Sequence, residues 1–140
     1  MNIKKLYQYF FYKLYKLFQV DERDWWSEWK AGLSIDVLVF IFLYSLLLYY
    51  NIFLNRHFDF DIKNIKLLFS LCYIALIVIP NYFIFHHRDQ WKKIVAEFDN
   101  LPKKKNRIGD WVIYSIVILI IANLIFAFYL MSQIDWSKYR

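Results

Sequence analysis

Long apolar runs alternate with polar segments along this chain. Three runs, 33–54, 67–85 and 111–131, are each roughly 19–22 residues long, or ~30 Å as helices at 1.5 Å per residue, which matches the hydrocarbon core of a bilayer. Lipid leaves only helices or closed barrels to satisfy the backbone, and the runs lack the strict alternation of barrel strands. We therefore predict an all-α membrane protein, one membrane domain over 1–140 with three transmembrane helices.

Residues 1–19 have a different pattern, because lysines recur through them. At 100° per residue one face collects apolar side chains, namely Ile3, Tyr7, Phe10, Leu14 and Leu17. The other face collects polar ones, namely Lys5, Gln8, Tyr12, Lys13, Lys16 and Gln19. This pattern predicts an N-terminal amphipathic helix that lies in the membrane interface. A helix that packs on a partner protein is the alternative.

Tryptophans mark the expected interfaces. Residues 24–32 form a tryptophan-rich segment before the first span, with Asp24 as a helix cap. Indole rings favour the headgroup level, where the ring is buried and the N–H stays hydrated. We expect six tryptophans at the membrane interface: Trp25, Trp26, Trp29, Trp91, Trp111 and Trp136.

The segment after the second span keeps a helical pattern. Apolar residues from Trp91 to Leu101 recur at helical spacing, and Pro102 stops the pattern. We predict that the second helix continues to about 101 as a cytoplasmic extension. Gly109 is expected to form a turn and Asp110 to cap the third span.

Composition agrees with a membrane protein. The chain is 60% hydrophobic and 23% aromatic, with a mean hydropathy of +0.29, against roughly 45–50% apolar residues in soluble proteins. Cys72 is the single cysteine, so no intramolecular disulfide forms. The first apolar run begins only at about Leu33, so we expect an uncleaved anchor rather than a signal peptide.

Charge predicts the orientation. The N-terminal segment and the second loop carry thirteen Lys and Arg residues, against five in the first loop and the tail. The positive-inside rule predicts a multi-pass protein of the bacterial cytoplasmic (inner) membrane, with its N-terminus inside and residues 132–140 as a periplasmic tail. Expected contacts to anionic lipid of the inner leaflet are Lys5, Lys13, Lys16, Lys103, Lys104, Lys105 and Arg107. Nucleic-acid binding is the rival interpretation of the basic cluster, and we predict none.

Three polar residues lie inside the apolar runs. Asp36 is the one acid within a span, and it is interpreted either as an acid tolerated near the interface or as a proton, ion or partner-contact site. Asn123 lies near the middle of the third span and is expected to find a partner on a neighbouring helix, with a polar path as the alternative. Asn81 follows Pro80, which predicts a kink whose freed carbonyl Asn81 could satisfy.

Signatures of chemistry are absent from the sequence. His86 and His87 are adjacent and point ~100° apart on a helix, so they chelate one metal poorly. Asp59-Phe60-Asp61 lacks the glycine and distal glutamate of a calcium loop, and capping of the second span is preferred. No phosphate loop, nucleophile elbow or HExxH motif occurs. We predict no enzymatic activity, no catalytic residue, no metal and no cofactor.

The form of the chain suggests a class of function. An aromatic and basic N-terminus before WKAG, a central EFDNLPKKKN loop and a C-terminal FYLMSQIDW resemble small three-span bacterial inner-membrane proteins, some of which are immunity factors for membrane-active toxins. The resemblance implies a protein that binds and restrains a protein partner. The alternatives are a pore-forming, holin-like or membrane-effector protein and an accessory subunit of a membrane complex. Sequence leaves the partner and the oligomeric state open.

Overall fold

The computed structural model describes residues 2–19, 26–54 and 63–139, and every element in them is a helix. The long elements are α1 (Ile3–Phe18), α2 (Ser27–Phe53), α3 (Lys63–Asn81), α4 (Gln90–Asp99) and α5 (Lys103–Ser132). Three helical stretches are long and apolar enough to cross a membrane, namely Ser27–Phe53, Leu67–Asp99 and Lys103–Ser132. This confirms the predicted all-helical fold with three helices long and apolar enough to span a membrane, as in a multi-pass membrane protein.

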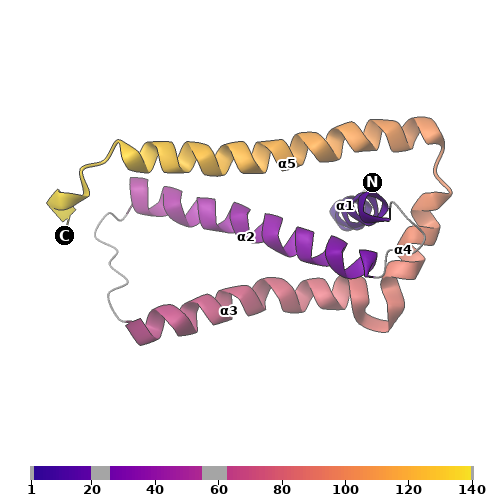
Figure 1. The fold of residues 1–140 in the computed structure, drawn as a ribbon, viewed down its shortest axis with the longest axis horizontal. Helices are drawn as coiled ribbons and strands as arrows, with labels where there is room; N and C mark the ends of the chain where they lie inside the picture. Colours follow the sequence, from indigo (N-terminus) through magenta and orange to yellow (C-terminus); the bar gives the residue numbers. More distant parts are fainter. Residues whose placement is uncertain (1, 20–25, 55–62, 140) are drawn as a thin grey trace.

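The three long helices form a flat layer rather than a closed bundle. In Figure 1, α2 lies in the middle, with α5 on one side of it and α3 on the other. Both outer helices pack on α2. Large apolar side chains remain exposed on all three, among them Phe40, Leu76 and Phe126. Such helices, apolar all round, are suited to lipid rather than water.

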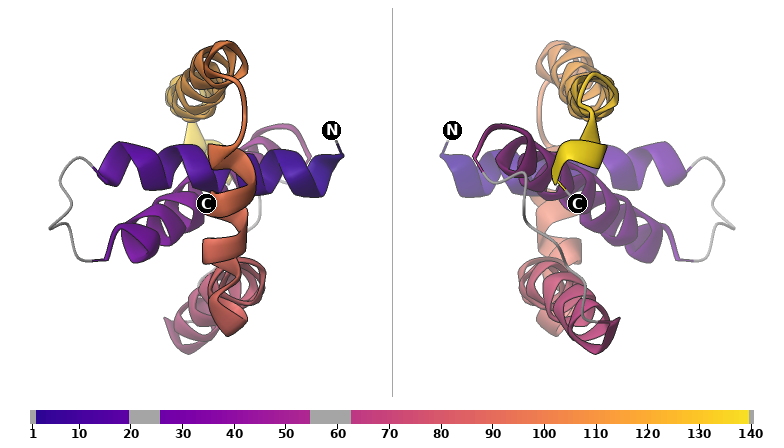
Figure 2. Two further views of the ribbon diagram at one scale, coloured as in Figure 1. Left: turned by 90° about the vertical axis from the view of Figure 1, so that its right-hand side faces the viewer. Right: turned by 90° about the vertical axis from the view of Figure 1, so that its left-hand side faces the viewer.

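Helix α1 crosses one end of this layer, as Figure 2 shows, and α4 crosses α1 in turn. The Asn2 side chain caps α1 by accepting a hydrogen bond from the Lys5 amide at 2.9 Å. Phe11 is 0% exposed and stacks on Phe85, with ring centroids 4.5 Å apart. Tyr12, which the sequence places on the polar face, is also buried. The structured core of the protein is therefore at this end, around α1.

A sharp turn separates α3 from α4. Pro80 lies in the last turn of α3 and is followed by a π-helical turn, η1 (Tyr82–His86), and a short 3₁₀ turn, η2 (His87–Asp89). Arg88 and Asp89 have positive φ angles of 53° and 54°, a conformation that breaks a right-handed helix. The predicted continuous extension to about 101 is thus replaced by a separate helix, α4, which ends at Asp99 and lies across α1.

Helix α5 begins eight residues before the predicted start of the third span. It starts at Lys103, directly after Pro102, so Gly109 and Asp110 are helical and neither forms the expected turn or cap. Gly109 is needed for a different reason. A Cβ atom added there would overlap the Tyr9 ring, so the glycine allows α1 to approach α5 closely. The predicted caps Asp24 and Asp59–Asp61, like Trp25, lie outside the described residues.

Candidate functional site: a groove along α2 and α3

A groove runs along the line where α2 meets α3. One cavity of about 520 Å³ is lined by α2 residues from Phe40 to Asn51 and α3 residues from Phe69 to Ile74. A second cavity of about 200 Å³ continues it towards Leu33 and Val78. The two cavities share Phe40 and Ile74, so they form one continuous groove, which we call the α2/α3 groove.

The α2 side of the groove follows a regular stripe. Its members recur at intervals of three or four residues: Leu33, Val37, Phe40, Tyr44, Leu47 and Asn51. This spacing keeps side chains on one face of a helix and is the spacing with which helices pack side by side. The stripe is only partly covered by α3, because Leu33, Val37, Phe40 and Tyr44 all remain exposed. The α2/α3 groove therefore has the surface of a helix that lacks one neighbour.

Asp36 lies at the α1 end of the α2/α3 groove, where it lines the smaller cavity. Its Oδ1 accepts a hydrogen bond of 2.6 Å from Nδ2 of Asn81. The Asn81 Oδ1 accepts a second one, also 2.6 Å, from the Tyr7 hydroxyl on α1. Asn81 thus joins three helices instead of satisfying the carbonyl freed by Pro80. Burial, above all, raises the pKa of Tyr7 to about 12, so this hydroxyl stays a donor at neutral pH.

Asn51 lies at the other end of the α2/α3 groove, near the end of α2. Its Oδ1 atom is buried and accepts no hydrogen bond from any residue that the structure describes. A buried acceptor without a donor costs roughly 1–3 kcal/mol. Sequence reasoning missed Asn51, although its position in the stripe of α2 could have drawn attention to it.

A separate polar cluster joins α2 to α5. Asn123 donates from Nδ2 to the Ser45 hydroxyl at 2.7 Å, and its Oδ1 accepts from the Tyr49 hydroxyl at 2.9 Å. The partner that we expected for Asn123 is therefore on α2. These bonds hold α2 and α5 together, and they engage both the Nδ2 and the Oδ1 atom of the Asn123 amide. Asp36 and Asn123 take part in different clusters and do not share a partner.

Three of the four lysines of α1 have carboxylate partners within the chain. Lys5 pairs with Glu97 and Lys16 with Asp99, at 2.8 and 2.9 Å. Lys13 is 10% exposed and lies 2.8 Å from Asp110. These three ion pairs bind α1 to α4 and α5, and the anionic lipid contacts expected for the same lysines stay a prediction. Lys103, Lys104, Lys105 and Arg107 are exposed at the start of α5, and none forms an ion pair among the described residues.

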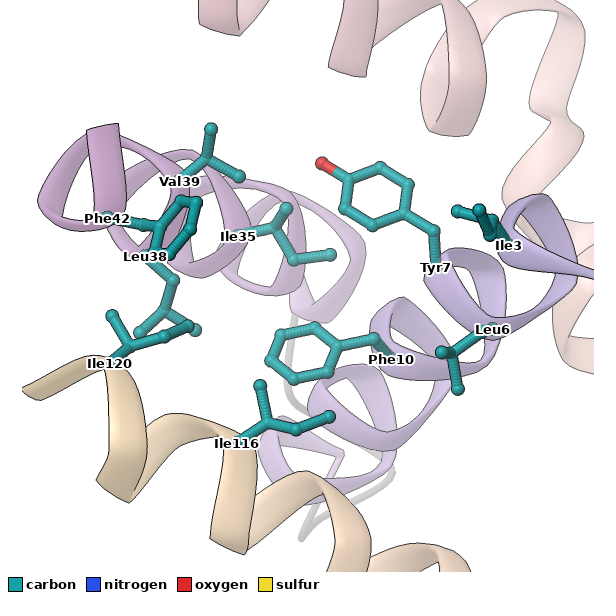
Figure 3. A pocket seen from close by; sticks show the side chains of 10 residues that line it. All are labelled: Ile3, Leu6, Tyr7, Phe10, Ile35, Leu38, Val39, Phe42, Ile116 and Ile120. Atoms are coloured by element: carbon teal, nitrogen blue, oxygen red, sulfur yellow. The ribbon is translucent and has the colours of Figure 1, made fainter. Parts of the chain in front are cut away.

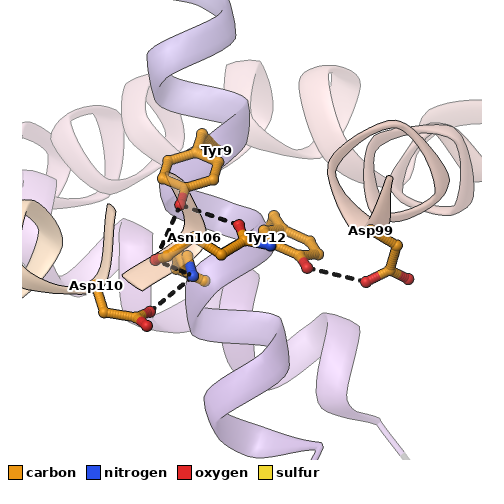
Figure 4. Close-up of polar contacts among 6 residues, drawn as sticks. Tyr9, Tyr12, Asp99, Asn106 and Asp110 are labelled. Atoms are coloured by element: carbon orange, nitrogen blue, oxygen red, sulfur yellow. Dashed lines mark hydrogen bonds and ion pairs between the residues drawn. The ribbon is translucent and has the colours of Figure 1, made fainter. Parts of the chain in front are cut away.

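Tyrosine hydroxyls complete the attachment of α1, as Figure 4 shows. The Tyr12 hydroxyl donates to Asp99 at 2.9 Å, and the Tyr9 hydroxyl donates to Asn106 Oδ1 at 3.3 Å. Burial and the neighbouring Asp99 carboxylate both raise the pKa of Tyr12. This cluster holds α1 to α4 and to the start of α5.

A second hollow lies in the angle between α1, α2 and α5, with a volume of about 230 Å³ (Figure 3). Its lining is apolar except for the hydroxyl of Tyr7, which already bonds to Asn81. The other lining residues are Ile3, Leu6, Phe10, Ile35, Leu38, Val39, Phe42, Ile116 and Ile120. The hollow offers an occupant no free polar group, so it is less selective than the α2/α3 groove.

Four of the predicted interfacial tryptophans lie near the α1 end of the layer. Trp26 and Trp29 are at the start of α2 and are exposed, as is Trp111 on α5, whereas Trp91 of α4 packs on Tyr15. Trp136 lies near the C-terminus, at the opposite end of the layer in Figure 1, and donates to the Met131 carbonyl at 3.1 Å.

His86 is held by packing. Its ring stacks on Trp29 at 4.2 Å, and its Nε2 lies 3.3 Å from the Glu28 carbonyl oxygen. Gly32 leaves room for this ring, because an added Cβ would lie 2.7 Å from His86 Cε1. Within residues 2–19, 26–54 and 63–139, no three His, Cys, Asp or Glu side chains are grouped as metal ligands would be.

Comparison with known proteins identifies no relative of this chain. No family model, curated protein or solved structure matches the chain. The choice of a candidate site therefore rests on the structure. We take the α2/α3 groove, because it has the polar residues Asp36 and Asn51 at its two ends.

Proposed function

We propose that this chain is a non-enzymatic membrane protein that binds and restrains a partner by holding one of the partner's transmembrane helices in the α2/α3 groove. The observation that carries the proposal is the open layer. Helices α3 and α5 lie on opposite sides of α2, and no third helix of the described residues closes the layer into a bundle. One face of α2 therefore keeps a stripe with helix-packing spacing that α3 covers only partly. Helices associate in membranes through van der Waals packing and interhelical hydrogen bonds, and the α2/α3 groove offers a partner helix both.

Immunity against a membrane-active toxin is the function of this kind that we propose first. It requires that the toxin's membrane segment be bound and kept from assembling, and it requires no chemistry of the binder. The resemblance to small bacterial inner-membrane proteins supports the same proposal.

We propose the bacterial inner membrane as the location, with the α1 end of the layer in the cytoplasm. The described basic residues of α1, α4 and the start of α5 gather at that end, and the C-terminus lies at the other. Lys103, Lys104, Lys105 and Arg107 then face the headgroups of the inner leaflet, and α1 lies at the interface beneath α4. A periplasm-active reporter fused after Arg140 should be active, and one fused after Lys105 should be silent; the reverse pattern contradicts the orientation.

Site-specific photo-crosslinking in living cells tests the binding proposal. A photoreactive amino acid at Tyr44, in the α2/α3 groove, should give a discrete protein adduct. The matched control is Phe126, an exposed aromatic residue on α5, which should give lipid adducts alone. Lipid adducts alone at both positions would contradict a groove for a partner. Expression of the chain should also leave growth and membrane potential unchanged, whereas depolarisation would point to a pore.

A further inference from the structure

We infer that the occupant of the α2/α3 groove is a transmembrane helix with a basic side chain at the level of Asp36 and a hydrogen-bond donor at the level of Asn51. This inference rests on the proposed function and specifies the chemistry of the partner. Asp36 and Asn51 are fifteen positions apart on α2, which is about 22 Å along a helix axis. They therefore mark the two ends of a stretch that most of a membrane span can cover.

Charge complementarity points to the basic side chain. Asp36 is the one acidic residue among those that line the α2/α3 groove. Its sole described hydrogen bond comes from the neutral Asn81 amide, and it forms no ion pair with any described residue. An acid within a span is costly until a cation compensates it. A lysine or arginine on the partner supplies that cation, whereas the acyl chain of a lipid carries no charge and cannot compensate the carboxylate.

The buried carbonyl of Asn51 supplies the second point of recognition. Asn51 Oδ1 accepts no hydrogen bond from any residue that the structure describes. A hydrogen bond from a partner helix therefore contributes most binding free energy here, because it removes the cost of an unsatisfied acceptor. Asn51 lines the groove, so a turn of its amide about the terminal side-chain bond brings this atom to the groove surface. Serine, threonine, asparagine or glutamine on the partner can then donate to it. Between these two points the lining is aromatic and aliphatic, with Phe40, Tyr44 and Tyr73 among the larger side chains. The partner's surface there should be small and apolar.

A second copy of this chain fits the groove poorly. A two-fold pair uses the same surface on both copies, so it sets one Asp36 carboxylate facing the other. Like charges at close range in a medium of low dielectric constant repel strongly. A helix from a different protein, with the opposite charge at this level, avoids that repulsion.

Designed transmembrane peptides provide the probe. The full chain is labelled with a donor dye at Cys72, its one cysteine, which is exposed on α3, and reconstituted in phosphatidylcholine vesicles. The acceptor-labelled probes are leucine helices of about 22 residues. One carries a lysine at the Asp36 level and a serine fifteen positions away. A second carries glutamate for lysine, a third carries leucine for serine, and a fourth carries leucine at both positions. Energy transfer reports binding in each case.

The lysine–serine probe should bind about tenfold more tightly than the leucine probe, and the glutamate probe should bind no more tightly than leucine. Asp36→Asn keeps an acceptor for Asn81 but should remove the lysine preference. The matched control Glu97→Gln, a carboxylate outside the groove, should leave it unchanged. Asn51→Leu should abolish the advantage of serine over leucine at the second position.

The outcomes separate this inference from the function on which it rests. Equal binding of the lysine, glutamate and leucine probes would overturn the charge recognition, while a protein adduct at Tyr44 in cells would still support a groove for a partner. A lysine preference that survives Asp36→Asn would also overturn the inference. Absence of protein adducts at Tyr44 in cells would instead contradict the proposed function itself.

Discussion

Replacement of Phe11 by alanine tests whether α1 is a structural part of the fold. Phe11 is 0% exposed and stacks on Phe85. Removal of a buried Phe side chain costs about 3–5 kcal/mol when the cavity does not collapse, and an aromatic pair accounts for about 0.5–1.5 kcal/mol beyond the buried area. Both rings of this pair lie in the core around α1. We therefore expect Phe11→Ala to lower the free energy of unfolding by about 3–5 kcal/mol.

The assay compares Phe11→Ala with Leu17→Ala, which removes a side chain that is 49% exposed on the same helix. The free energy of unfolding is measured in bicelles by titration with a denaturing detergent. Attachment of α1 is measured separately, as the yield of a crosslink that a short bis-maleimide reagent forms between cysteines replacing Lys5 and Glu97 in a Cys72→Ser background. Leu17→Ala should have little effect on either readout. An equal loss of stability in both variants, with unchanged crosslinking, would refute the attachment of α1 described above.

Three further predictions concern single contacts. Gly109→Ala should destabilise the protein by about 1–3 kcal/mol, and Tyr9→Leu should recover part of that loss, measured as a double-mutant cycle of unfolding free energies. Asn123→Leu should cost about 0.6–2 kcal/mol through its lost bonds to Ser45 and Tyr49, measured in the same titration. Because the pKa of Tyr7 is raised from 10.0 to about 12, its hydroxyl ionises first in the unfolded chain, so its contribution is complete below pH 10 and is lost as pH rises towards 12. The fall in unfolding free energy over that interval should be smaller in Tyr7→Phe.

Hydropathy was sufficient to predict the spans because lipid imposes one rule on every residue within it. Hydropathy does not predict which faces of the spans contact one another. Helix α2 is apolar on all sides, so the order of apolar residues does not say which face meets α3, which meets α5 and which stays open. The stripe that includes Phe40 and Tyr44 becomes a groove only when the positions of α3 and α5 are known.

Two errors of the sequence interpretation share a cause, which is tertiary contact. Gly109 was interpreted as a turn because glycine weakens helices, but its small size serves the approach of Tyr9. The polar face of α1 was predicted from its lysines, yet Lys13 lies mostly buried beside Asp110. A periodic pattern reports that one face is apolar, and it does not distinguish lipid from another helix as the cover.

The attachment of α1 joins parts of the chain that are far apart in sequence. Lys5 and Glu97, which pair in the folded protein, are 92 residues apart. At a synthesis rate of ~5–20 residues per second, the partner emerges about 5 to 18 s after Lys5. During that interval the aromatic side chains of α1 have neither α4 nor α5 to cover them, and the bilayer surface is the apolar phase within reach. Newly made α1 should therefore rest on the membrane surface until α4 and then α5 are made and cover it. Late in folding, the side chains that these helices cover exchange a contact with lipid for a contact with protein, while α1 itself stays at the interface.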